Sequence, residues 1–227
     1  MAGNGDVKVL GAWPSPFAHR PRIALHLKDV DYVYVEENLA SKSELLIKSN
    51  PIHKKVPVLI HNGNCVSESL VIVEYIDEVF SSGHSLLPSD AYDRAISRFW
   101  AAYIDSKWFG SLRGVVAAKT EEERKAAVEE VATGMGLLEE AFEKMSKGKG
   151  FFGGERIGYL DIAFGSCLAW MRVAEELSNS KFVSEAATPG IHGWAERFAS
   201  AAAVKDVLPE TEKLLGYAEA RFGAKAF

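Results

Sequence analysis

Short apolar runs in the first eighty residues predict a mixed sheet flanked by helices. The runs Val7–Leu10, Tyr32–Glu36 and Val58–Ile60 are rich in β-branched and aromatic residues, which is typical of strands. Asn62-Gly63, between the third run and Cys65-Val66, predicts a two-residue hairpin turn. Helical patterns fill the intervals and follow the hairpin, so the expected order is β-α-β-α-β-β-α. The first two strands should be parallel because a helical crossover joins them, and the last two antiparallel.

Two serines mark the expected starts of helices. Ser15 stands directly before Pro16, and an N-cap residue followed by proline favours a helix start. Pro21 is expected to bend or delay the first turn of this helix. Ser69 is placed to open a second helix. The residues expected to face inward are Phe17, Ile23, Ala24 and Leu27 in the first helix, with His19 and Arg20 elsewhere, and Ile72, Ile76, Val79 and Phe80 in the second.

The pattern from residue 91 onward is helical and offers no strand candidates. One long amphipathic helix is expected over residues 91–116, and Thr120 with Glu123 predicts a capping box that begins the next, which ends near Met145. A mostly apolar helix follows over residues 160–177, with shorter ones at 190–199 and 204–222. Because residues 81–91 are rich in Ser, Gly and Pro, the sequence predicts a domain at 1–80, a linker at 81–91 and an all-helical domain at 92–227.

Composition narrows the classes of partner. A net charge of -5 without a basic stripe argues against a nucleic-acid surface. No apolar run reaches the ~18 residues that a membrane span needs. The two cysteines lie far apart in the sequence and form no disulfide framework, which favours a reducing compartment. A cytoplasmic protein without a membrane segment is therefore expected.

The candidate chemistry gathers at one edge of the predicted sheet. Neither a glycine-rich nucleotide motif nor a metal-spaced Cys/His cluster occurs, so no metal site is expected. Ser15, the Lys54-Lys55 pair and Glu68-Ser69 each have a plainer interpretation, as a helix cap, solvated charges and a helix start. Pro57 should begin its strand or lie at a turn, and an X-Pro bond is where a cis peptide costs only about 0.5–1 kcal/mol. Together these groups indicate a seat for a small zwitterion with carboxylates.

Several motifs in combination resemble the plant tau class of glutathione S-transferases. They are Trp13–Phe17, Lys48–Gly63, Glu68–Leu70, Arg98–Ala101 and Phe151–Gly154. The resemblance implies an α/β thioredoxin-like N-terminal domain, an all-α C-terminal domain, a homodimer and a cis Pro57. It also implies conjugation of reduced glutathione, as co-substrate, to hydrophobic electrophiles, with possible peroxide reduction and no prosthetic group.

By this resemblance Ser15 is the catalytic residue, whose hydroxyl hydrogen-bonds the glutathione sulfur. A thiol with a pKa near ~8.5 is only a few per cent ionised at neutral pH. A hydroxyl donor beside a helix N-terminus favours the thiolate. Lowering the pKa by ~2 units requires ~2.7 kcal/mol, which one charge-assisted bond and a helix dipole can supply.

The resemblance also implies the glutathione-binding residues. Lys42 and Lys55 would hold the glycine carboxylate, and the Val56 backbone would pair with the cysteinyl backbone. Glu68 and Ser69 would take the γ-glutamyl amine and carboxylate. An acidic side chain suits an ammonium group, and a helix N-terminus suits a carboxylate.

The electrophile would bind between the two domains. The candidates are Phe17 from the first domain and Phe109, Arg113, Val116 and Trp170 from the second, although plain core packing is the other interpretation of the aromatic residues.

Two features depart from the commoner pattern of the family. Arg20 stands where the family often has a basic residue near the entrance of the electrophile pocket. Its neighbours His19 and Pro21 depart from the commoner pattern at this entrance. Gly158 stands where many relatives carry Ser or Thr, so the core helix is expected to rely on Asp161.

Two other functions remain open. A non-catalytic carrier of hydrophobic ligands, or ligandin, would have the same fold and bind without conjugation. A thiol-disulfide reductase would want a cysteine at the position of Ser15. Cys65 and Cys167 are instead expected on a strand and a core helix, where a buried, inert thiol is the default.

Overall fold

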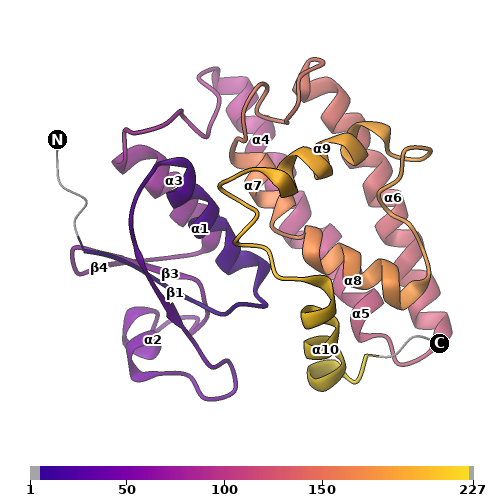
Figure 1. Ribbon diagram of the computed structural model, residues 1–227, viewed down its shortest axis with the longest axis horizontal. Coiled ribbons are helices and arrows are strands. Elements are labelled where there is room, and N and C mark those ends of the chain that lie inside the picture. Colours follow the sequence, from indigo (N-terminus) through magenta and orange to yellow (C-terminus); the bar gives the residue numbers. More distant parts are fainter. Residues whose placement is uncertain (1–5, 225–227) are drawn as a thin grey trace. The chain divides into compact units, whose positions relative to one another are not determined.

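The computed structural model describes residues 6–224 and divides the chain into two compact units (Figure 1). The division falls between Leu87 and Pro88. The first unit contains β1 (Val7–Gly11), α1 (Pro16–Leu27), β2 (Val33–Glu36), α2 (Glu44–Ser49), β3 (Val58–His61), β4 (Asn64–Ser67) and α3 (Ser69–Val79). This is the predicted β-α-β-α-β-β-α order.

The sheet has the strand order β2-β1-β3-β4. β1 and β2 are parallel and β3 and β4 are antiparallel, as the crossover and hairpin predicted. β3 is also antiparallel to β1, which the sequence did not predict. Asn62 and Gly63 have φ values of 50° and 81°, which is the left-handed backbone that a tight two-residue hairpin turn requires. The turn therefore sets the register in which His61 faces Asn64.

Helices cover both faces of the sheet. Leu10 and Val58 are register partners, so they share one face, and Leu46 of α2 packs against them there. On the other side α1 and α3 pack together (Figure 1). The structure thus confirms a thioredoxin-like arrangement in the first unit.

The prediction for the inward faces of α1 and α3 was partly wrong. His19 and Arg20 are completely buried, whereas Phe17 and Leu27 are only half-buried. In α3 Ile72 and Ile76 are buried as expected, but Val79 is exposed and Phe80 half-buried. The α1 helix also continues through Pro21 as one element. Polar partners inside the fold explain the burial of His19 and Arg20, and a hydrophobic pattern does not reveal such partners.

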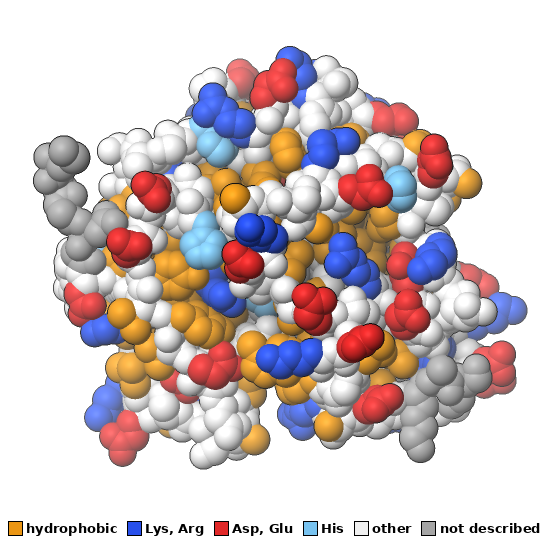
Figure 2. All heavy atoms as spheres, viewed as in Figure 1, with side chains coloured by type: hydrophobic (Ala, Val, Ile, Leu, Met, Phe, Trp, Pro, Cys, Tyr) orange, Lys and Arg blue, Asp and Glu red, His pale blue; other side chains and the backbone are white. Residues whose placement is uncertain are grey.

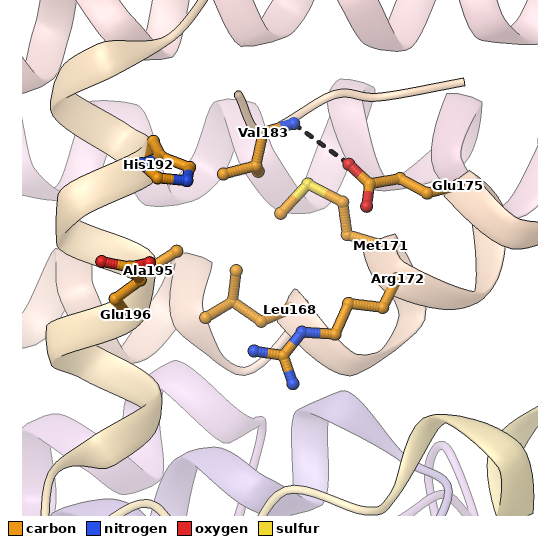
Figure 3. Close-up of a pocket in the computed structure, with 8 residues that line it drawn as sticks. All are labelled: Leu168, Met171, Arg172, Glu175, Val183, His192, Ala195 and Glu196. Carbon is orange, nitrogen blue, oxygen red and sulfur yellow. Dashed lines mark hydrogen bonds between the residues drawn. The ribbon is translucent and has the colours of Figure 1, made fainter. Parts of the chain in front are cut away.

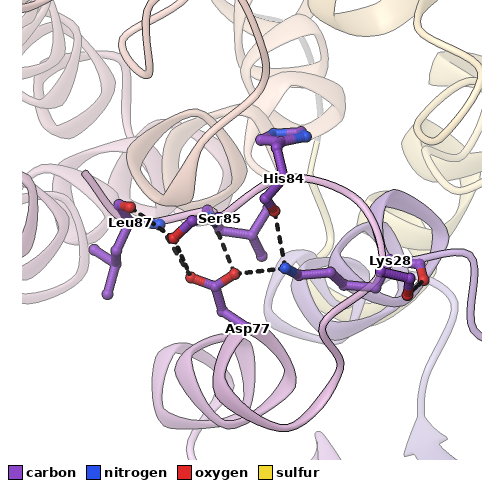
Figure 4. A network of polar contacts seen from close by, with 7 residues as sticks. Lys28, Asp77, His84, Ser85 and Leu87 are labelled. Atoms are coloured by element: carbon purple, nitrogen blue, oxygen red, sulfur yellow. Dashed lines mark hydrogen bonds and ion pairs between the residues drawn. The ribbon is translucent and has the colours of Figure 1, made fainter. Parts of the chain in front are cut away.

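A buried ion pair ties α1, α3 and the end of the first unit together (Figure 4). Lys28 Nζ lies 2.8 Å from Asp77 Oδ1, and the two side chains are 3% and 8% exposed. Lys28 also donates to the carbonyl oxygen of His84 at 2.8 Å. The remaining donors to the Asp77 carboxylate are Leu86 N, Leu87 N and Ser85 Oγ.

Asp77→Asn is expected to lower the free energy of unfolding by about 3–5 kcal/mol, because it leaves the Lys28 ammonium buried without a countercharge. Burial raises the pKa of Asp77, but the hydrogen bonds from Lys28, Leu86 and Leu87 outweigh it and hold that pKa below its ordinary value of 3.8. The stabilisation is therefore present above the unfolded-state pKa and is lost as the pH falls through the lower folded value.

Urea unfolding of the Asp77 variant at neutral pH and below pH ~4 tests this expectation. The exposed Asp31→Asn serves as the matched control. A variant as stable as the wild type at neutral pH would contradict it.

The second unit is helical apart from an isolated bridge between Phe151 and Gly154. Its elements are α4 (Ala91–Tyr103), the π-helical turn η1 (Ile104–Trp108), α5 (Phe109–Ala117), α6 (Glu121–Ser146), α7 (Tyr159–Gly165), α8 (Leu168–Ser178), α9 (Pro189–Ser200) and α10 (Thr211–Phe222).

Two helices that were predicted as continuous, over residues 91–116 and 160–177, are each interrupted in the structure. η1 separates α4 from α5, and Ser166-Cys167 separates α7 from α8. Trp108 at the end of η1 is buried against Gly134 of α6, where a side chain would collide with the indole. Phe99, one of the apolar residues of α4, is 61% exposed. A π-helical turn shifts which residues after it face inward, so one uniform periodicity does not continue from α4 into α5.

Asp161 lies at the centre of the second unit and is completely buried. Its carboxylate accepts hydrogen bonds from Phe152 N at 2.8 Å, Gly153 N at 2.9 Å, Gly158 N at 2.8 Å and Trp194 Nε1 at 2.8 Å. Gly158 has no side chain with which to cap α7, and Asp161 binds its backbone instead, as the sequence predicted. One carboxylate thus joins the start of α7, the preceding loop and α9.

The surface carries charges of both signs. Acidic and basic side chains are interspersed over the face drawn in Figure 2. Within residues 6–224, no helix combines the length and the apolar character that a membrane span requires.

Candidate functional site

The sheet brings the segments that carry the candidate residues to one edge. Gly11 at the end of β1 faces Glu36 at the end of parallel β2. β3 begins at Val58, which faces both Leu10 and Ser67, the last residue of β4. One edge of the sheet therefore carries four segments. Three of them follow β1, β2 and β4, and the fourth leads into β3. The candidates on them are Ser15, Lys42, Lys55, Val56, Glu68 and Ser69.

Ser15 is the N-cap of α1, and Pro16 occupies the first helical position, as predicted. Ser15 Oγ accepts a hydrogen bond from Ala18 N at 3.3 Å, and Ser15 N donates to Ala12 O at 2.9 Å. Because a hydroxyl has one donor and two acceptor positions, this capping bond leaves the Ser15 proton available to a further acceptor. The side chain is half-buried.

The loop before Ser15 is fixed from both sides. Trp13 N donates to Glu36 Oε1 at 3.0 Å, and His19 Nε2 lies 2.9 Å from Trp13 O. A carbonyl oxygen only accepts, so Nε2 is the nitrogen of His19 that carries the proton in this bond. Buried His19 thus positions the loop that presents Ser15, a role that sequence periodicity did not show.

The Val56-Pro57 peptide is cis, as the resemblance implied. The preceding loop is organised by buried Asn50, whose Nδ2 donates to Lys55 O at 3.0 Å and whose Oδ1 accepts from His53 N at 3.1 Å. The Lys55 side chain is exposed, and so is that of Lys42, in the segment after β2. Both ammonium groups are therefore accessible to a carboxylate from solvent.

Glu68 and Ser69 stand at the start of α3. Glu68 has a φ of 73° and an exposed side chain, and His53 Nε2 lies 3.8 Å from its Oε1. Ser69 is the first helical residue and is buried; its Oγ accepts from Nη1 of Arg20 at 3.1 Å. The Arg20 guanidinium also lies over the Phe17 ring, 5.0 Å from its centroid. Arg20 therefore joins α1 to the start of α3.

The candidate electrophile residues form two groups. Phe17 belongs to the first unit. Phe109, Arg113 and Val116 lie on α5 at spacings of four and three residues, which places them on one side of the helix. Phe109 and Val116 are buried and Arg113 is exposed. Trp170 of α8 is also buried, and its ring packs edge-on against Tyr217 and Phe222 of α10.

The two thiols differ in exposure. Cys65 on β4 is exposed, so the expectation that both cysteines are buried was wrong for this one. Cys167 is buried between α7 and α8. Among residues 6–224, no group of three or more His, Cys, Asp or Glu side chains is arranged to hold a metal ion.

Comparison with known families agrees with this geometry. Residues 5–78 match the glutathione S-transferase N-terminal domain, and residues 99–200 match the glutathione S-transferase C-terminal domain. The chain belongs to the glutathione S-transferase family. The first matched segment contains most of the sheet edge with Ser15, and the second contains α5 and α8.

Its similar proteins place this transferase in the plant tau class. Glutathione S-transferase U17 of Arabidopsis thaliana is 57% identical over 220 residues, which cover 96% of this chain and 97% of the relative. The crystal structure of a tau class glutathione S-transferase from mango, Mangifera indica, superposes with a TM-score of 0.92 at 60% identity and covers 95% of this chain and 98% of its own.

A rice glutathione S-transferase solved in complex with glutathione has a TM-score of 0.85 at 35% identity, with 96% of this chain and 97% of its own covered. A tripeptide of this kind therefore binds to a protein with the same two-part fold.

Proposed function

We propose that this transferase conjugates reduced glutathione to hydrophobic electrophiles and that the Ser15 hydroxyl stabilises the attacking thiolate. The observation that carries the proposal is the placement of Ser15. Its oxygen caps α1 while its proton remains available, on a loop fixed by Glu36 and His19. A hydroxyl donor and a helix N-terminus both favour a negative charge at this position.

The reaction requires only a nucleophile and a place for the electrophile. The thiol gives its proton to solvent, and the thiolate attacks an electrophilic carbon to form a carbon–sulfur bond. In a chloro-nitroaromatic substrate, chloride then leaves with the electron pair of its bond. Ser15 stays neutral and donates its hydrogen bond throughout, so it needs no general base of its own. The same thiolate is suited to reducing peroxides.

The charged ends of glutathione fit the remaining groups. Because Arg20 donates to Ser69 Oγ, the Ser69 proton is available to the γ-glutamyl carboxylate at the start of α3. Exposed Glu68 suits the γ-glutamyl ammonium. The Val56 backbone would pair with the cysteinyl residue, and Lys42 and Lys55 would hold the glycine carboxylate.

Residues of both units are the candidates for binding the electrophile. The candidate in the first unit is Phe17. The candidates in the second unit are Phe109, Arg113, Val116 and Trp170. In this arrangement residues 1–80 bind glutathione, residues 92–227 bind the electrophile, and residues 81–91 link them.

A homodimer in the cytoplasm is the expected form. Each unit exposes large apolar side chains, with Ile52 83% and Val71 56% exposed in the first and Tyr92 71% and Phe99 61% in the second. A contiguous patch of such side chains is typical of a binding face. Light scattering of the purified protein measures the oligomeric state, and cell fractionation measures the location.

A conjugation assay tests the function directly. The protein, reduced glutathione and a chloro-dinitrobenzene are mixed, and the rate is compared with the uncatalysed rate. We expect saturable catalysis in both substrates. Binding of a hydrophobic dye without conjugation of any electrophile in a panel would instead support the carrier, or ligandin, function.

A further inference from the structure

A cavity of about 170 Å³ lies in the second unit, between α8, α9 and the chain that joins them (Figure 3). It contains none of the residues assigned above to glutathione or to the electrophile. Its lining combines an apolar floor with a polar rim. The lining residues are Leu168, Met171, Arg172, Glu175, Val183, His192, Ala195 and Glu196.

The floor has the size and character to hold one apolar side chain. Leu168 and Met171 from α8 and Ala195 from α9 are buried, and Val183 faces them from the connecting chain (Figure 3). A cavity of about 150 Å³ lined by aliphatic groups is known to accept a benzene ring. The volume here is therefore enough for a ring or a branched aliphatic group.

Of the four polar residues at the rim, Glu175 already has partners within the protein. The Glu175 carboxylate accepts hydrogen bonds from Phe182 N at 2.8 Å and Val183 N at 3.1 Å, and Lys181 Nζ lies 3.6 Å from it. These contacts hold the connecting chain against α8 and neutralise the charge. Glu175 is thus part of the wall.

The two other charged residues have opposite signs and come from opposite walls. Arg172 lies on α8 and Glu196 on α9 (Figure 3). Within the part of the chain that the structure describes, neither side chain makes a hydrogen bond or an ion pair, with each other or with any other residue. Each is therefore available to a group of opposite charge on a bound molecule, with His192 as a further polar neighbour.

We propose that this cavity binds a free amino acid with a large apolar side chain. The side chain fills the floor, the carboxylate pairs with Arg172 and the ammonium pairs with Glu196. Both Arg172 and Glu196 are exposed. A molecule with only one of these charges would pair with one wall and leave the other charge unpaired, whereas a zwitterion pairs with both. The binding needs neither glutathione nor Ser15, so the test below is independent of the transferase reaction.

Methionine methyl groups report on the cavity. The chain has four methionines, of which Met171 lines the floor, whereas Met135 is buried on α6. The whole protein is labelled with ¹³C at the methionine methyls, and the Met171 signal is assigned with Met171→Leu. On titration with L-phenylalanine we expect the Met171 signal to shift saturably while the Met135 signal stays in place.

Two analogues and two variants test the charge pairing. Phenethylamine lacks the carboxylate and phenylpropanoate lacks the ammonium, so each is expected to bind about two- to fivefold more weakly than phenylalanine, as the loss of one solvent-exposed ion pair predicts. Arg172→Gln should weaken phenylalanine binding and remove its advantage over phenethylamine. Glu196→Gln should remove the advantage over phenylpropanoate. Exposed Lys125→Gln and Glu129→Gln on α6 are the matched controls and should bind like the wild type.

Three results would overturn the proposal. The first is a Met171 signal that does not move at tens of millimolar phenylalanine. The second is equal affinity for phenylalanine, phenethylamine and phenylpropanoate. The third is an affinity for phenylalanine in both Arg172→Gln and Glu196→Gln that equals that of the wild type. The rate of glutathione conjugation, measured on the same samples, confirms that each variant is folded.

Discussion

Replacement of Ser15 by alanine is expected to lower kcat/KM for conjugation by about 30- to 150-fold. A hydrogen bond to a charged group contributes about 2–3 kcal/mol, and each ~1.4 kcal/mol is a factor of ten in rate. The KM for glutathione should change little, because the proposed binding residues for the charged ends of the tripeptide are other than Ser15. The measurement is steady-state kinetics with a chloro-dinitrobenzene at varied glutathione.

The controls separate catalysis from helix capping. Loss of the Ser15 cap costs about 0.5–2 kcal/mol of stability. Thr120→Ala removes the corresponding cap of α6, where Glu123 N donates to Thr120 Oγ1 at 3.1 Å, without touching the sheet edge. It should lose stability and keep its activity, whereas Ser15→Thr keeps a hydroxyl and should retain most of the rate. Wild-type kcat/KM in a folded Ser15→Ala protein would show that the hydroxyl is only a cap.

Replacement of Asp161 by alanine is expected to have the largest effect on stability, a loss of about 4–5 kcal/mol in the free energy of unfolding. It removes the acceptor for four donors, three of them in buried hydrogen bonds and the fourth, Gly153 N, in a partly buried one. Each buried donor left unsatisfied costs about 1–3 kcal/mol before relaxation. For a chain of this size the midpoint of thermal unfolding should fall by about 10 °C.

Asp161→Asn should also be strongly destabilised. Each carboxylate oxygen accepts two of the four donors, so either orientation of the amide turns an NH₂ group toward two of them. Exposed Asp206→Asn is the matched control. Thermal unfolding of the alanine variant at the same temperature as the wild type would contradict this account of the core.

The pH dependence of this effect has a definite sign. Burial raises the pKa of Asp161 from its ordinary 3.8 to about 6, although the four hydrogen bonds oppose the rise. A raised folded-state pKa contributes stability that is fully present below the unfolded-state value and is lost as the pH rises through about 6. The wild type should therefore exceed Asp161→Asn in stability by more at pH ~4 than at pH ~7.

Local features of the first unit could be predicted from the sequence because they depend on neighbouring residues. The hairpin follows from Asn62-Gly63 and the start of α1 from Ser15-Pro16. These elements also determine the sheet edge, since the topology brings the ends of β1, β2 and β4 and the start of β3 together. The position of Ser15 at this edge was therefore accessible to sequence reasoning.

Features that depend on distant partners could not be predicted in the same way. Arg20 is buried because Ser69 accepts its hydrogen bond from another helix, and His19 because it binds the Trp13 carbonyl. The turn at Trp108 packs against Gly134, which lies 26 positions later in the sequence. The cavity between α8 and α9 likewise combines residues from separate helices. In each case the deciding contact is tertiary and leaves no periodic signal.

The pKa of the glutathione thiol in the complex tests the central claim most directly. Thiolate absorbance in the ultraviolet is followed against pH for glutathione bound to the wild type and to Ser15→Ala. We predict a pKa about 2 units below the ordinary ~8.5 in the wild type and a return of at least about 1 unit toward that value in the variant. Equal thiol pKa values in the two complexes would contradict the assignment of Ser15.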